Sequence, residues 1–325
     1  MRIGVIGGGA WGTALAQVAA AGGEVLLWAF EPEVVDAINA DHVNPLFLAG
    51  VPLSPAIKAT NDLGALAACE ALLVVTPAQH MRRILGAAPV DARPLILCSK
   101  GIEAETMALM SEAATATCPD APIAVLSGPT FASEVAKGLP TAVTLACADD
   151  AVAGRLAKRI ARPGFRPYRS TDVIGAEIGG AVKNVLAIAC GVVEGAGLGK
   201  NARAALIARG FAEMTRFGLA RGARPETLAG MSGLGDLVLT CSSEQSRNFS
   251  LGLGLGQGKS AASLMADRRT VAEGAFTAPV LVEAARAAGV EMPISEAVAA
   301  LLEGKVGVKA AVEALLARPL KEETV

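Results

Sequence analysis

A glycine-rich segment near the start of the chain has the composition of a phosphate-binding turn. Residues 7–12 read Gly-Gly-Gly-Ala-Trp-Gly and fit G-x-G-x-x-G, directly after an apolar run. In this pattern Gly7 permits a tight turn, Gly9 lets the backbone approach a pyrophosphate, and Gly12 lets helix and strand pack closely. The N–H groups that open the following helix face the phosphates. The segment predicts a dinucleotide site; the alternative is a glycine-rich turn without a ligand.

An acidic residue follows at the position where a residue that binds the ribose of the dinucleotide is expected. Glu31 ends the second apolar run, about 20 residues after the glycines, and a carboxylate there can accept from a ribose 2′-hydroxyl. The motif leaves the cofactor open between a flavin and a nicotinamide. Nothing else in the chain suggests a flavin, so a nicotinamide dinucleotide is the favoured ligand.

Nicotinamide chemistry at a ketone or alcohol needs a proton donor and acceptor, and the chain offers few. Its only histidines are His42, in a loop containing Pro and Asn, and His80, at the start of a helix. Both are interpreted as surface or capping residues. The only tyrosine is Tyr168, and Asp172 stands four positions on, so a Tyr-x-x-x-Lys pair is absent.

Lys183 is the remaining candidate for the proton transfer. It lies in Gly-Gly-Ala-Val-Lys-Asn (179–184), among small and apolar residues, where a lysine is costly unless it faces a polar cleft. Burial and the proximity of Lys100 would lower its pKa toward the range of proton exchange. We predict Lys183 as the catalytic residue; the alternative is a side chain that extends along the helix to reach water.

Four further places could contribute to a ligand site. Lys100 follows an apolar strand, and Gly128 follows the next one, at the sheet edge where such folds bind ligands. Asp236 could orient Lys183 or accept from a substrate hydroxyl, or it could simply cap a helix. Arg247 and Asn248 pair a planar cation suited to phosphate with an amide, but such pairs are also common on protein surfaces, and the residues alone do not single this one out.

The elements that must position these residues alternate in the first half of the chain. Apolar runs with helix-compatible stretches between them predict an α/β fold, an N-terminal Rossmann-like, doubly wound parallel sheet with helices on both faces. The predicted strands are 3–6, 24–28, 71–75, 94–98, 123–126 and 142–146, and the first helix is 13–21.

The second half follows the helical period and predicts an all-α C-terminal domain. Expected helices are 175–194, 202–218, 280–288, 295–303 and 308–316. The segment 251–258, LGLGLGQG, lacks a preceding strand and is interpreted as a flexible connection. The boundary is placed within 162–172, which gives a dinucleotide-binding domain over 1–170 and a substrate and catalytic domain over 171–325. The active site is expected between them.

Composition excludes several classes of protein. Hydrophobic residues make up 52% of the 325 residues and charged residues 18%, with a net charge of −2, which argues against disorder and against nucleic-acid binding. Two histidines and no CxxC pair make a metal site unexpected. The six cysteines are expected to be buried thiols in a reducing compartment. We expect no export signal, no stable membrane insertion and a cytoplasmic location.

Several segments together resemble bacterial NAD(P)-dependent sn-glycerol-3-phosphate dehydrogenases. They are GGGAWGTALA (7–16), HVNPLFLAGVPL (42–53), IKAT (57–60), SKGIE (99–103), LSGPTFASEVAKGLPTAV (126–143), GGAVKNVLAIACGVVEG (179–195), GLGDLVLTCSSEQSRN (233–248) and VAEG (271–274). The resemblance implies reversible hydride transfer between reduced nicotinamide and dihydroxyacetone phosphate, a phosphorylated triose. It also implies a role in supplying glycerol 3-phosphate for phospholipids, and a homodimer.

The same resemblance implies roles for individual residues. Lys183 would donate and accept the catalytic proton, and Lys100 would touch both substrate and cofactor. The residues implied to line the substrate are Lys100, Gly128, Thr130, Lys183, Asp236, Ser246, Arg247 and Asn248. Together with the residues read from the motif, those expected at the cofactor are Gly7, Gly9, Ala10, Trp11, Gly12, Phe30, Glu31, Lys100, Ala132, Arg247, Val271 and Glu273.

The chain departs from the family pattern after its second strand. Members that use NADPH commonly carry Arg or His there, whereas this chain has Phe30 followed by Glu31. A carboxylate accepts from a 2′-hydroxyl and repels a 2′-phosphate, so we predict a preference for NADH over NADPH. The alternative is that Phe30 stacks on the adenine while Arg82 or Arg83 supplies a cation.

Two other functions remain open on the sequence. One is a different β-hydroxyacid dehydrogenase with a helical C-terminal domain, acting for example on 6-phosphogluconate. Such an enzyme should lack the segment from DLVLT to SRN, which is present here. The other is a non-catalytic dinucleotide sensor, which would tolerate loss of Lys183, Asp236 or Arg247.

Overall fold

The computed structural model describes residues 1–266 and 272–319, and they form two compact units. Unit 1 comprises residues 1–100 and 110–173, and unit 2 comprises 101–109 and the chain from 174 onward. The segment 162–172, in which we placed the boundary, contains a strand. The division of roles between two domains at residue 170 stays a prediction.

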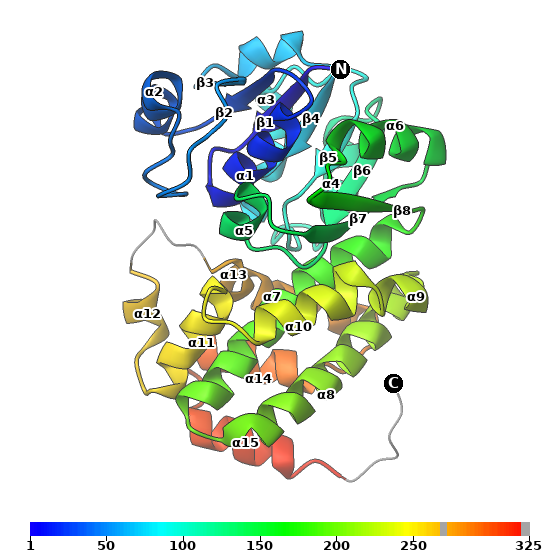
Figure 1. Cartoon of the computed structure of the whole chain (residues 1–325). Helices are drawn as coiled ribbons and strands as arrows, with labels where there is room; N and C mark the ends of the chain where they lie inside the picture. The colour runs from blue at the N-terminus through cyan, green and yellow to red at the C-terminus, as the bar shows by residue number, and fades with distance from the viewer. Residues whose placement is uncertain (267–271, 320–325) are drawn as a thin grey trace. The chain divides into compact units, whose positions relative to one another are not determined.

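Unit 1 is built on one eight-stranded sheet with the order β3-β2-β1-β4-β5-β6-β7-β8 (Figure 1). The strands are β1 (Ile3–Ile6), β2 (Val25–Trp28), β3 (Ile57–Thr60), β4 (Ala71–Val74), β5 (Leu95–Leu97), β6 (Ile123–Ser127), β7 (Thr141–Cys147) and β8 (Phe165–Ser170). Strands β1 to β6 are parallel and follow the order 3-2-1-4-5-6 of a doubly wound dinucleotide-binding sheet, which confirms the predicted fold class.

The end of the sheet differs from the expected parallel arrangement. Strand β7 pairs with β6 antiparallel, and β8 then pairs with β7 in parallel, so the last two strands run opposite to the first six. A parallel return needs a long crossover, and the short link 128–140 holds only the one-turn helix α5 (Ala132–Ala136).

Two strands of this sheet were not predicted, and both lie at its edges. In β3 only alternate residues are buried, and β8 contains Pro167 and has only Phe165 buried. Edge strands tolerate polar residues and proline because one side has no strand to pair with. Neither strand therefore has the continuous apolar run that identified the inner strands.

The helices of unit 1 separate into groups on the two faces of the sheet. Helices α1 and α5 pack together, and α3 packs with α4 (Figure 1). Right-handed crossovers that leave β1 toward β2 and β4 toward β5 put their helices on opposite faces. The remaining bounds are α1 (Ala10–Ala20), α2 (Pro32–Asp41), the 3₁₀ turns η1 (Leu63–Ala68) and η2 (Ala78–His80), α3 (Met81–Ala87), α4 (Met110–Thr117) and α6 (Asp150–Ile160).

Unit 2 is helical within its described residues, as predicted. Its elements are α7 (Val173–Gly195), α8 (Gly199–Ala220), α9 (Pro225–Leu228), the π-helical turn η3 (Met231–Gly235), α10 (Asp236–Cys241), α11 (Arg247–Gly256), α12 (Ala261–Leu264), α13 (Glu273–Ala287), α14 (Pro293–Leu302) and α15 (Val308–Leu316). Among the residues that the structure describes, α7 alone is long and apolar enough to cross a membrane, and 89% of its apolar window is buried inside the protein.

The prediction of a flexible connection over 251–258 is wrong, because residues 251–256 lie in α11 and only 257 and 258 follow its end. Glycine here serves close helix packing. A Cβ on Gly252 would lie 2.0 Å from the Ile188 carbonyl oxygen of α7, and one on Gly191 would lie 2.0 Å from the Phe249 carbonyl oxygen of α11. The backbones of the two helices therefore touch, and glycine is the only residue that fits at these positions.

Candidate active site

The predicted dinucleotide loop has the geometry that its glycines imply. Gly7 has φ +125°, and a Cβ there would lie 2.7 Å from the Val75 carbonyl oxygen. A Cβ on Gly12 would lie 1.9 Å from the Gly7 carbonyl oxygen, so helix α1 approaches the end of β1 closely. The Cβ position of Gly9 is open, with nothing within 4 Å.

Helix α1 begins at Ala10, and its N-cap is Gly9, which has no side-chain cap. The N-terminal N–H groups and the positive end of the helix dipole therefore lie beside the open side of the loop. Trp11 lies in the first turn, and its indole nitrogen is buried with no hydrogen-bond partner among the described residues. Open backbone over a helix N-terminus fits the pyrophosphate of a dinucleotide.

Phe30 and Glu31 lie beside this loop at the end of β2. The loop is tied to β2 by a hydrogen bond from the Gly7 N–H to the Trp28 carbonyl, 2.9 Å. Phe30 is 74% exposed, an unusual position for an aromatic side chain. Glu31 is the N-cap residue of α2, although its carboxylate makes no capping bond.

Three predicted ligand-binding residues meet at the carboxyl edge of the sheet in unit 1. The ammonium of Lys100, after β5, lies 3.5 Å from the Gly128 carbonyl oxygen, and the Thr130 hydroxyl donates to the same oxygen at 3.2 Å. Gly128 has φ +152°, and a Cβ there would press on Val143. Ala132 opens helix α5, which packs on α1.

The centre of the candidate site in unit 2 is a buried ion pair. Lys183, on α7, donates to Asp236 Oδ1 at 2.6 Å and to the Thr240 hydroxyl at 2.9 Å. The Thr240 hydroxyl in turn donates to Asp236 Oδ1 at 3.2 Å. The exposed fraction is 6% for Lys183 and zero for Asp236. Lys183 therefore does not extend to water, and Asp236 is the first residue of α10, whose N-cap is Gly235.

The packing of α7 on the π-helical turn η3 sets this ion pair. A Cβ on Gly179, one helical turn before Lys183, would lie 2.2 Å from the Ser232 carbonyl oxygen of η3. This turn runs directly into Asp236 at the start of α10. Thr240 was missed in the sequence, although its position one turn after Asp236 in the same helix is the signal that could have found it.

A second polar contact joins the starts of α11 and α13 to α7. Asn248 donates from Nδ2 to the side-chain oxygen of Asn184 at 3.0 Å, and its own oxygen accepts from the Gly274 N–H at 2.9 Å. Asn184 was not singled out in the sequence. Glu273, the first residue of α13, lies next to this contact.

The other predicted residues of this segment have different surroundings. The Ser246 hydroxyl caps α11 by accepting from the Phe249 N–H at 3.2 Å. Arg247 is exposed in the first turn of α11. Val271 lies outside the described residues. The substrate and cofactor contacts that we expect of all these residues stay predictions.

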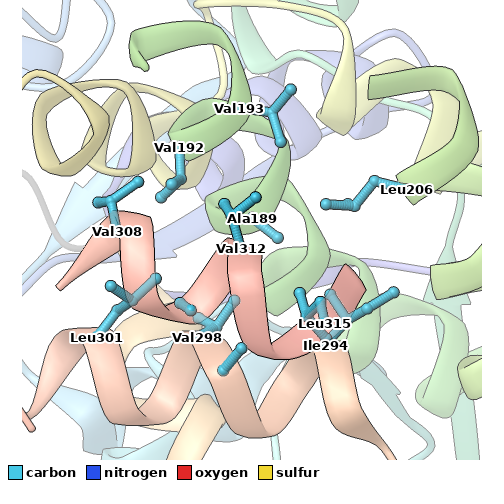
Figure 2. Close-up of a pocket in the computed structure, with 12 residues that line it drawn as sticks. Ala189, Val192, Val193, Leu206, Ile294, Val298, Leu301, Val308, Val312 and Leu315 are labelled. Atoms are coloured by element: carbon cyan, nitrogen blue, oxygen red, sulfur yellow. The ribbon is translucent and has the colours of Figure 1, made fainter. Parts of the chain in front are cut away.

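An apolar cavity elsewhere in unit 2 does not match the predicted ligand. It has a volume of about 40 Å³ and lies among α7, α8, α14 and α15 (Figure 2). Val192, Leu206, Val298 and Leu315 are among its lining residues, and the whole lining is apolar. A phosphorylated triose needs polar partners that this cavity lacks.

A dinucleotide loop on a doubly wound sheet, with a helical unit that buries a lysine–carboxylate pair, defines a nicotinamide-dependent dehydrogenase. Residues 2–153 match the N-terminal profile of the NAD-dependent glycerol-3-phosphate dehydrogenases, and residues 172–313 match the C-terminal profile. The chain belongs to this family.

Individual relatives agree with this membership. The chain is 64% identical over 323 residues to a glycerol-3-phosphate dehydrogenase [NAD(P)+] of Sphingopyxis alaskensis, covering 99% of this chain and 98% of that protein. It is 59% identical to the Caulobacter vibrioides protein of the same name, with the same coverage. The crystal structure of glycerol-3-phosphate dehydrogenase from Coxiella burnetii matches with a TM-score of 0.93 at 38% identity, over 98% of this chain and 99% of that one.

More distant structures share only the fold. A ketopantoate reductase from Ralstonia eutropha matches with a TM-score of 0.61 at 16% identity, over 96% of this chain and 100% of that one. The family match therefore favours glycerol-3-phosphate dehydrogenase over the other hydroxyacid dehydrogenases that the sequence left open.

Proposed function

We propose that the protein interconverts dihydroxyacetone phosphate and sn-glycerol 3-phosphate with NAD(H) or NADP(H), supplying glycerol 3-phosphate for phospholipid synthesis. The observation that carries the proposal is the buried ammonium of Lys183, held by Asp236 and Thr240. A buried cation at a fixed position can stabilise the negative oxygen that forms when a ketone is reduced, and can protonate it.

The cofactor fits the loop of unit 1. Its pyrophosphate would lie over Gly9 and the N-terminus of α1, where a Cβ would fill space that is open. When bound in its reduced form, the dinucleotide supplies the hydride. The residues proposed to contact it are Trp11, Lys100, Ala132, Arg247 and Glu273.

The residues of unit 2 supply the proton. During reduction Lys183 Nζ gives a proton to the oxygen that was the carbonyl oxygen, and the lysine becomes neutral. In the reverse direction it takes the proton from the hydroxyl of glycerol 3-phosphate. Asp236 and the Thr240 hydroxyl hold the nitrogen in one place, which removes the cost of ordering it during the reaction.

Arg247 is the proposed partner of the substrate phosphate. A cation in the first turn of a helix is disfavoured by the helix dipole, whereas an anion there is favoured by both the dipole and the guanidinium. Arg247 stands at that place in α11 and is exposed. Lys100, Gly128, Thr130, Ser246 and Asn248 are proposed as further substrate contacts.

The preference for NADH over NADPH is also proposed. The exposed ring of Phe30 offers a stacking surface beside the dinucleotide loop, and Glu31 adds a negative charge next to it. A 2′-phosphate would be repelled at this place, whereas a 2′-hydroxyl could donate to the carboxylate. Comparing kcat/KM for the two cofactors tests this directly, and a higher value for NADPH would contradict it.

The assay for the main proposal follows the absorbance of reduced nicotinamide with dihydroxyacetone phosphate. Turnover is expected to be much faster with dihydroxyacetone phosphate than with unphosphorylated dihydroxyacetone at the same concentration. Turnover of 6-phosphogluconate with the oxidised cofactor instead would favour the other hydroxyacid dehydrogenase, and cofactor binding without turnover would favour a sensor. We further propose that the protein is cytoplasmic and that it forms a homodimer. Light scattering of the purified protein would test the homodimer.

A further inference from the structure

Asn44 is a fully buried polar residue to which the proposed reaction assigns no role. It lies between α2 and β3, and its exposed fraction is zero. Its amide nitrogen donates to the Gly8 carbonyl oxygen at 2.8 Å and to the Thr13 hydroxyl at 2.8 Å. Its side-chain oxygen accepts from the Phe47 N–H at 3.1 Å, which anchors the amide in its own loop.

Thr13 completes a clamp on the same carbonyl. Its hydroxyl, also fully buried, donates to the Gly8 oxygen at 3.2 Å. The carbonyl in the middle of the dinucleotide loop therefore receives two side-chain donors, one from α1 and one from the 42–53 segment. Without them a run of three glycines would have wide backbone freedom, since glycine populates both signs of φ.

The direction of the Gly8 carbonyl decides where the next N–H points. The Gly8–Gly9 peptide is trans, and a planar trans peptide directs its C=O and its N–H to opposite sides. With the Gly8 oxygen turned toward Asn44 and Thr13, the Gly9 N–H is turned away from them. The loop on the Gly9 side is open, with nothing within 4 Å of its Cβ position.

We infer that Asn44, with Thr13, is a positioning residue for the dinucleotide: it fixes the Gly8 carbonyl and thereby aims the Gly9 N–H at the cofactor pyrophosphate. The inference rests on the proposed function, because it takes the Gly9 side of the loop as the phosphate site. A loop held in its binding conformation loses less entropy on binding than a free one. Asn44 acts through the backbone and does not itself touch the ligand.

Asn39 provides a matched control in the same unit. Its side chain also makes two hydrogen bonds to backbone, donating to the Ala59 carbonyl at 3.0 Å and accepting from the Ala59 N–H at 2.9 Å. These bonds join α2 to β3 and not to the glycine loop. Replacing Asn39 with alanine removes a similar set of bonds without releasing Gly8.

The test is the dissociation constant of NADH without substrate, followed by energy transfer from the tryptophans to the nicotinamide. Asn44→Ala should weaken NADH binding about tenfold, from the loss of the buried hydrogen bond to the Gly8 carbonyl and of the bond to the Thr13 hydroxyl, which donates to the same carbonyl. It should leave kcat at saturating NADH, and KM for dihydroxyacetone phosphate, within about twofold. Asn39→Ala should change NADH affinity by less than about twofold. Equal effects of the two variants on NADH affinity would overturn the inference.

A second pair of variants covers the case in which Asn44→Ala does not fold. Thr13→Val removes the hydroxyl and should weaken NADH binding several-fold, whereas Thr13→Ser keeps the hydroxyl and should restore it. Equal NADH affinity of these two variants would also overturn the inference. The function is tested separately by wild-type turnover, so a wild type that binds NADH without turnover would contradict the function and not the role of Asn44.

Discussion

Lys183 Nζ lies 2.6 Å from Asp236 Oδ1, and the side chains of the pair are 8% and 0% exposed. A buried ion pair of this kind gains little net stability, because removing both charges from water costs about as much as their attraction returns. Removing one partner is costly, since it leaves a buried charge without compensation. The pair is therefore best explained by the need for a positioned ammonium group.

Asp236→Asn should lower the free energy of unfolding by about 3–5 kcal/mol and reduce turnover at least tenfold. The exposed pair of Arg169 and Asp150 in unit 1, 3.0 Å apart, is the control. Asp150→Asn should cost less than about 1 kcal/mol, because water screens that pair. Denaturant unfolding measures the loss of stability, and the nicotinamide absorbance assay measures the loss of turnover. A cost for Asp236→Asn as small as for Asp150→Asn would contradict the prediction.

Arg247→Lys keeps the charge and loses the planar fork that suits a phosphate. KM for dihydroxyacetone phosphate should rise about tenfold or more, while the low activity with unphosphorylated dihydroxyacetone should hardly change. Steady-state kinetics with the two substrates measure the difference. If the variant lost activity equally with both substrates, Arg247 would not be the residue that binds the phosphate.

The buried Glu213 of α8 should make stability fall with rising pH. Its carboxylate accepts from the Ile294 and Ser295 N–H groups at the start of α14, yet burial raises its pKa to about 7, above the unfolded value of 4.5. The folded state thus favours the protonated form. The stability that this provides is full below about pH 4.5 and is lost as the pH rises through about 7, by up to about 3 kcal/mol.

Urea unfolding at a series of pH values between about 5 and 8 checks this prediction. Glu213→Gln cannot ionise, so the loss of stability over this range should be smaller in the variant than in the wild type. Parallel pH profiles for the two proteins would show that Glu213 does not titrate as predicted.

The contact of α7 with α11 leads to a prediction about two neighbouring buried glycines. Gly252→Ala would place a Cβ 2.0 Å from the Ile188 carbonyl oxygen, so the helices must separate, at a cost of about 1–3 kcal/mol or more. Gly254→Ala would meet only the end of the Leu264 side chain, 2.6 Å away, which can rotate. Thermal unfolding should show a clear loss of stability for Gly252→Ala and little change for Gly254→Ala. A larger loss of stability for Gly254→Ala than for Gly252→Ala would contradict the prediction.

The inner strands and the glycine loop could be predicted because local pattern and burial agree there. Strands β1, β2, β4 and β5 are buried along their whole length, so each appears in the sequence as a continuous apolar run. The edge strands β3 and β8 lack it. Helix α11 was misinterpreted because glycine lowers helix propensity, and only the tertiary contact with Gly191 explains it.

The candidate site was predictable to a different degree. Lys183 could be identified because a lysine within an apolar helix is costly without a partner, and the contact with Asp236 is present in the structure. The hydrogen bond from Lys183 to the Thr240 hydroxyl depends on how α7 packs against α10, and no local sequence pattern specifies that packing. For the same reason the link from Asn44 to Gly8, between distant parts of the chain, was not expected.

The most direct test of the proposed reaction is the turnover of Lys183→Ala with NADH and dihydroxyacetone phosphate, measured beside its NADH dissociation constant. Loss of the proton donor and of the charge that stabilises the alkoxide should lower kcat by about 10³-fold or more. NADH affinity should stay within a few-fold of wild type, because the dinucleotide loop belongs to unit 1. A variant that kept more than about a tenth of wild-type turnover would show that Lys183 is not the proton donor.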